Sequence, residues 1–105
     1  MNATTHTDIV RAAQWIAASK ALFERALDQS PIAMRRTAGR ACAAYLKADR
    51  ALSRASRAAR GRLMHPETHD RAACVMVQSL VVTAMAWRNS DDFARCMSLV
   101  GGPLA

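Results

Sequence analysis

The sequence predicts an all-α protein, a small antiparallel helical bundle of about four helices in a single domain that spans residues 1–105. Apolar residues recur every three or four positions along most of the chain, and no stretch alternates with a period of two. Proline and glycine, only 3 and 4 residues in 105, fall mainly where residues typical of helix starts and stops also occur. The intervening loops are short, which favours antiparallel neighbours. Residues 1–7 and 101–105 are expected to be frayed tails.

The first helix is expected over residues 8–28, with Thr7 or Asp8 as its N-cap. Its apolar positions follow the three- and four-residue spacing of one helix face, so this face should be buried. The residues on it are Ile9, Ala12, Ala13, Ile16, Phe23 and Leu27.

The second helix is expected to begin at Ser30-Pro31, because a serine cap followed by proline at the first helical position is a strong start signal. It should run to about Arg60, with Gly61 as the stop. Gly39 costs a helix interior about 1 kcal/mol relative to alanine, so either one helix or two consecutive ones are possible. The apolar face is mostly small residues, which permit close approach of a neighbour. They are Ala38, Ala41, Ala48, Ala55 and Ala59.

The third helix is expected to open at His65-Pro66-Glu67 and to end at Asn89. Hydrophobic residues surround most of its circumference, which is typical of a helix at the centre of a bundle or in a subunit interface. We therefore expect an apolar third helix at the centre, and a homodimer is a further prediction. A short fourth helix over residues 91–100 starts with two carboxylates, Asp91 and Asp92, at the positive end of its dipole.

Composition excludes several classes of protein. The chain is 51% hydrophobic and 22% charged, which argues against a disordered or low-complexity protein. The first residues lack the basic and apolar regions of a signal peptide, and the longest uncharged stretch is too short to span a bilayer. Three well-separated cysteines, Cys42, Cys74 and Cys96, do not suggest a disulfide framework. These features favour a cytoplasmic protein with reduced thiols.

The charge is concentrated in one segment. The chain has a net charge of +7. Residues 31–63 contain nine basic residues and a single acidic one, Asp49, so this segment alone carries a charge of +8. Six of these bases fall within an arc of about 100° on the second helix and span about 32 Å. These six residues, the basic stripe, are Arg36, Arg40, Lys47, Arg50, Arg54 and Arg57, and the bases that flank them are Arg35, Arg60 and Arg62.

The stripe predicts a non-enzymatic protein that binds an anionic partner. Guanidinium groups bind phosphate bidentately, so the phosphate backbone of DNA or RNA is the first candidate. The second helix lacks interleaved aromatics and base-reading amides, so little sequence specificity is expected. An alternative is an adaptor or inhibitor, such as one encoded on a mobile element, that docks on an acidic protein surface or a nucleoprotein complex. A third interpretation is that the stripe is an ordinary solvent-exposed face, whose many arginines reflect GC-rich codon usage and not a binding role. Membrane binding is disfavoured because alanine buries little area.

Signals for catalysis or for a metal are weak. His65, Glu67, His69 and Asp70 form the one cluster of ligand types, without a second ligand pair, so helix-dipole and surface roles explain them better. Cys74 and His69 are expected about 140° apart around a helix, too far for a nucleophile and its base. We therefore expect no enzyme activity, no metal and no cofactor.

Overall fold

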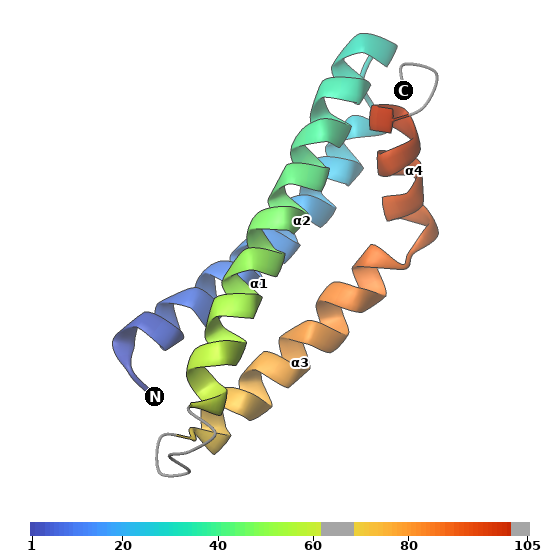
Figure 1. Cartoon of the computed structure of the whole chain (residues 1–105). Coiled ribbons are helices and arrows are strands. Elements are labelled where there is room, and N and C mark those ends of the chain that lie inside the picture. The colour runs from blue at the N-terminus through green and yellow to red at the C-terminus, as the bar shows by residue number, and fades with distance from the viewer. Residues whose placement is uncertain (62–68, 102–105) are drawn as a thin grey trace.

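The computed structural model describes residues 1–61 and 69–101, and within these ranges all regular secondary structure is helical (Figure 1). This confirms the predicted all-α bundle. The elements are α1 (Ala3–Ala26), α2 (Pro31–Arg60), α3 (Arg71–Arg88) and α4 (Asp91–Gly101).

The helices form an elongated molecule of 53 × 22 × 18 Å. Helices α1 and α2 run antiparallel, and α3 returns along α2 in the opposite direction, as Figure 1 shows. The chain then bends at Asn89-Ser90, and α4 continues in roughly the same direction as α3 rather than reversing (Figure 1). The prediction that consecutive helices are antiparallel therefore holds for the first three helices and was wrong for the last pair.

Helix α2, not α3, is the central element. It packs against α1, α3 and α4, and its contact with α1 is the most extensive in the bundle. Helix α3 was expected at the centre, but it buries one face and leaves the others to solvent. Its buried residues are Ala73, Val77, Ala84 and Trp87.

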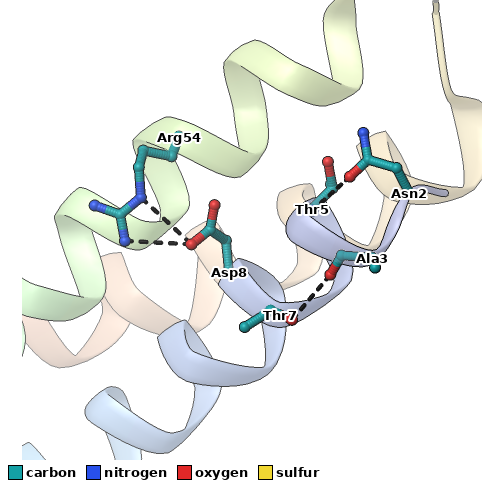
Figure 2. A network of polar contacts seen from close by, with 6 residues as sticks. All are labelled: Asn2, Ala3, Thr5, Thr7, Asp8 and Arg54. Atoms are coloured by element: carbon teal, nitrogen blue, oxygen red, sulfur yellow. Dashed lines mark hydrogen bonds and ion pairs between the residues drawn. The ribbon is translucent and has the colours of Figure 1, made fainter.

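The start of α1 differs from the prediction. The helix begins at Ala3, and Asn2 is its N-cap, with the Asn2 side-chain oxygen accepting a 2.8 Å hydrogen bond from the backbone N–H of Thr5 (Figure 2). Residues 3–7, expected to be a frayed tail, are therefore helical. Asp8 lies inside the helix and is not its cap.

Helix α2 is continuous through Gly39, so the alternative of two consecutive helices was wrong. Ser30 occupies the cap position before Pro31, and Gly61 ends the helix with a positive φ of 66°, as its predicted role as a stop requires. A methyl group added at Gly39 would meet Val100 of α4 at an ordinary van der Waals distance of 3.9 Å. Gly39 is therefore not needed for close approach.

The inner face of α2 consists largely of alanine. The buried residues of this helix share a single side, and apart from Thr37 and Leu52 each is an alanine. Methyl groups hold neighbouring helices at the short end of the usual separation of about 8–10 Å. The buried alanines are Ala38, Ala41, Ala44, Ala48, Ala51, Ala55 and Ala59.

A buried serine joins three helices. Ser19 of α1 is fully buried, and its hydroxyl donates to the carbonyl oxygen of Ala41 in α2 at 2.7 Å. The hydroxyl oxygen of Ser19 in turn accepts a 2.8 Å hydrogen bond from Nε1 of Trp87 in α3. Each polar group therefore has a partner, as burial requires.

Aromatic rings pack together around Trp87, at the end of the bundle that α4 covers. The Trp87 ring lies edge-on to Phe23 and Phe93, with centroids 6.0 and 5.6 Å apart. Tyr45 of α2 packs against Phe93 at 5.1 Å. Such pairs contribute about 0.5–1.5 kcal/mol each beyond the burial of their area. They fix α4 on the bundle despite its short length.

The start of α3 also differs from the prediction. It begins at Arg71, with the Asp70 side chain accepting from the N–H of Ala73 at 3.0 Å. The expected opening at His65-Pro66-Glu67 lies outside the described residues, as do Arg62 and the last residues of the expected C-terminal tail. Within the described ranges, none of the helices is long and apolar enough to cross a bilayer.

Replacing Ser19 with alanine should lower the free energy of unfolding by about 1–3 kcal/mol, because the N–H of Trp87 would be left buried without an acceptor. Urea unfolding followed by circular dichroism measures this change. Ser98→Ala is the matched control, since Ser98 is exposed on α4. Equal effects of the two substitutions would contradict the structural role of Ser19.

Gly39→Ala should stabilise the protein by about 0.5–1 kcal/mol, because alanine is the better helix former and the added methyl meets no close neighbour. A rise of a few degrees in the midpoint of thermal unfolding is expected. Gly101→Ala, at the last residue of α4, should have a smaller effect. A destabilised Gly39→Ala variant would show that α4 packs against this position more tightly than the structure has it.

Candidate anion-binding face

The basic stripe lies on the outer side of α2, opposite the alanine face. All six of its side chains are exposed, as are those of the flanking Arg35 and Arg60. The third flanking residue, Arg62, is outside the described residues. Helix α2 contains eight bases and a single acid, so its net charge of +7 equals that of the whole chain. The predicted concentration of charge on one side of a helix is therefore present.

One carboxylate from another helix reaches the stripe. Asp8 of α1 accepts hydrogen bonds from Nε and Nη2 of Arg54, both at 3.3 Å, in a bridge between α1 and α2 (Figure 2). The Asp8 side chain is 11% exposed, whereas that of Arg54 is 50% exposed. Arg54 thus anchors the two helices and still presents part of its guanidinium group to solvent.

The rest of the stripe is not neutralised in this way. Within residues 1–61 and 69–101, Arg54 is the only member of the stripe that forms an ion pair. The acid of α2, Asp49, lines a hollow of about 390 Å³ between α2 and α3, and Arg57 and Arg60 line the same hollow further along the helix. Acidic side chains therefore border the stripe on both sides, Asp8 toward α1 and Asp49 toward α3.

On the side toward α1, helices α1 and α2 form a basic groove of about 310 Å³. Arg11 of α1 lines it together with Lys47, Arg50 and Arg54, so four cations converge from two helices. Sequence reasoning missed Arg11, because the residue belongs to a different helix from the stripe. The sequence did contain a signal, because Asp8, Arg11 and Trp15 have the spacing of one helix face. An antiparallel alignment of α1 with α2 brings this face opposite Arg54, Arg50 and Lys47.

Trp15 forms one wall of this basic groove. The ammonium of Lys47 lies over the indole ring, 4.4 Å from its centroid, which is within the range of a cation–π interaction. The contact holds the Lys47 charge at the groove. It also covers a face of Trp15, so this ring is not a free platform for stacking a base.

The cluster near His69 is arranged differently from the prediction. Sγ of Cys74 lies 3.6 Å from Nε2 of His69, although the two were expected on different sides of a helix. The reason is that α3 begins at Arg71, so His69 belongs to the preceding loop and can reach back to the first turn. His65 and Glu67 lie outside the described residues.

This cluster has few features of a metal or catalytic centre. Asp70 caps α3 and pairs with the terminal amine of Met1 at 3.0 Å, and these hydrogen bonds hold the pKa of its carboxyl below the usual value. In the part of the chain that the structure describes, no group of three or more potential metal ligands occurs. The contact of Cys74 with His69 alone falls short of the four ligands of a structural zinc site.

The other two cysteines belong to the interior. Cys96 is fully buried in the aromatic cluster and Cys42 packs beside it, as expected for small core residues. Burial raises the pKa of both thiols, that of Cys96 to about 11. Both groups are therefore protonated and weakly nucleophilic at neutral pH.

No family model matches the chain, and no similar curated protein or solved structure was found.

The raised pKa of Cys96 predicts a loss of stability at high pH. Between pH 9 and about 11 the thiol ionises in the unfolded chain but keeps its proton in the folded one. The free energy of unfolding should therefore fall as the pH rises, by at most about 1.4 kcal/mol per pH unit from this group. Urea unfolding of the wild type and of Cys96→Ala over pH 8–11 measures the effect. Parallel pH profiles for the two proteins would refute this assignment.

Proposed function

We propose that the protein binds the phosphate backbone of double-stranded nucleic acid, with little sequence specificity, through the outer face of α2 and the basic groove that it forms with α1. The observation that carries the proposal is the exposed row of guanidinium groups on a straight helix, with Asp8 as its cross-helix ion-pair partner in the described residues. Like charges at this spacing destabilise a helix unless a counter-charge lies against them.

The length and chemistry of the face fit a polyanion. The stripe spans about 32 Å, close to one helical turn of B-form DNA. Seven of the eight bases of α2 are arginines, which match phosphate bidentately and are weakly hydrated. A duplex carries one negative charge per about 1.7 Å of its axis, so a row of this length meets phosphates throughout.

The surroundings of the aromatic residues favour a duplex over a single strand. Stacking platforms need aromatic faces open beside the basic residues. Lys47 covers Trp15, and Tyr45 packs on Phe93 inside the bundle. DNA and RNA duplexes both remain within this proposal, because each offers the same backbone chemistry.

Binding to random-sequence duplex should weaken steeply with salt. If the six stripe residues each contact a phosphate, log K should fall against log[salt] with a slope near −5 for DNA. Fluorescence anisotropy with a labelled duplex of about 20 base pairs, titrated at several salt concentrations, gives this slope. No binding at low salt up to about 100 µM protein would exclude nucleic acid and favour the alternative, an acidic protein surface.

Two double variants that remove the same charge distinguish binding through the basic stripe from a general effect of net charge. Arg40→Gln with Arg50→Gln should reduce the salt slope by about 2, because each lost phosphate contact changes it by about 1. Lys20→Gln with Arg25→Gln removes the same charge from exposed positions of α1 and should leave the slope nearly unchanged. Arg54 is kept intact in both proteins, since its loss would leave Asp8 buried without a partner. Equal slopes for the two variants would contradict the proposed face.

A further inference from the structure

Helix α3 presents an uncharged surface to solvent on the side away from its buried residues. No charged side chain occurs between Arg71 and Arg88, although the chain as a whole is strongly basic. Two large apolar side chains on this side are well exposed, Val75 by 70% and Val82 by 61%. Exposed apolar residues grouped on one uncharged side of a helix are typical of an interaction site.

The apolar surface continues onto α1. A groove of about 580 Å³ runs between the two helices, next to Val75, and most of its lining is apolar. The side chains that line it are Ile9, Val10, Ala13 and Gln14 of α1 and Val75, Met76, Ser79 and Leu80 of α3.

On the side of α3 opposite its buried residues, six exposed positions, the last of them its C-cap, have the spacing of a coiled-coil seam. They follow one another at alternating intervals of three and four residues, which is the a/d pattern of a heptad repeat. This seam lies on the solvent side, so no helix of the same chain fills it. We refer to it as the outer seam, and its residues are Ala72, Val75, Ser79, Val82, Ala86 and Asn89, all exposed.

We propose that the outer seam is the interface of a homodimer, in which α3 packs antiparallel against α3 of a second copy around a two-fold axis between Ser79 and Val82. In this register Val75 faces the partner's Ala86, and Val82 faces the partner's Ser79. Each valine thus meets a small residue, so the surface is complementary to itself. A parallel register would instead place valine on valine and alanine on alanine.

Charge also favours a second copy as the occupant. Two chains of net charge +7 repel each other, and the uncharged outer seam is where they can approach with least repulsion. At its ends, the antiparallel register brings Arg71 opposite the partner's Ser90, next to the carboxylates that begin the partner's α4. Opposite charges of the two copies therefore come near each other at both ends of the outer seam.

The proposal is independent of the function proposed above. The outer seam shares no residue with the basic stripe or with the basic groove between α1 and α2, so a dimer would leave both copies of that face exposed. Failure of nucleic-acid binding would leave the dimer unaffected, and a monomeric protein could still bind a duplex.

Sedimentation equilibrium tests the oligomeric state. At about 100 µM the wild type should sediment at twice its chain mass of 11.4 kDa. Val82→Glu should be monomeric while its circular dichroism stays native, because the residue is exposed in the single chain. Ile32→Glu, at a position of α2 that is 71% exposed, is the control and should remain dimeric. A monomeric wild type, or a Val82→Glu variant that still dimerises, would overturn the proposal.

A charge-swap experiment tests the register. Val75→Glu and Ala86→Lys should each weaken the homodimer, since a charge would be buried in the interface. When the two proteins are mixed, the antiparallel register places Glu at 75 opposite Lys at 86 in the partner, and heterodimers should form. The comparison mixture is Val75→Glu with Val75→Lys, which pairs only in a parallel arrangement. Restoration in this second mixture and not in the first would reject the antiparallel register.

Discussion

The close contact of α2 with its neighbours through alanine methyl groups is the constraint from which the other features follow. Because the inner side of this helix contains little besides alanine, α1 can lie near it along most of its length. Because the helices are close together on this side, there is no room there for long basic side chains, and these lie on the outer side of α2. Helix α2, with alanine on one side and basic residues on the other, therefore determines both the packing of the bundle and the position of its charge.

Because alanine buries little apolar area, contacts between larger side chains must also stabilise the bundle. The aromatic cluster supplies it at the end where α4 lies. The bend at Ser90 makes this possible: the Ser90 hydroxyl donates to the carbonyl of Trp87 and accepts from the N–H of Phe93. Helix α4 can then turn its apolar face, with Phe93 and Cys96, onto α2. The hydrogen-bonded Ser19 fixes the orientation of Trp87 within the cluster.

Local sequence signals were enough for the helical class and for part of the face, but not for which helix is central or for the direction of α4. Periodicity and the Ser-Pro start predicted four helices, and the spacing of the arginines correctly predicted that the stripe is exposed. The errors arose where a feature depends on two helices at once. The roles of Asp8, Arg11 and Trp15 depend on the alignment of α1 with α2, which the pattern of α1 alone does not contain. Helix starts were also misplaced, because Asn2 and Asp70 compete with nearby residues of similar capping ability.

The alanine contact has a consequence for the basic groove that Arg11 and Lys47 line. Its width is set by the separation of α1 and α2, and methyl groups already hold that separation near its minimum. At the buried alanines of α2, most replacements add volume and would move the two helices and their cations apart. Substitutions on the inner side of α2 therefore change the width of the basic groove, whereas substitutions on its outer side leave that width unchanged.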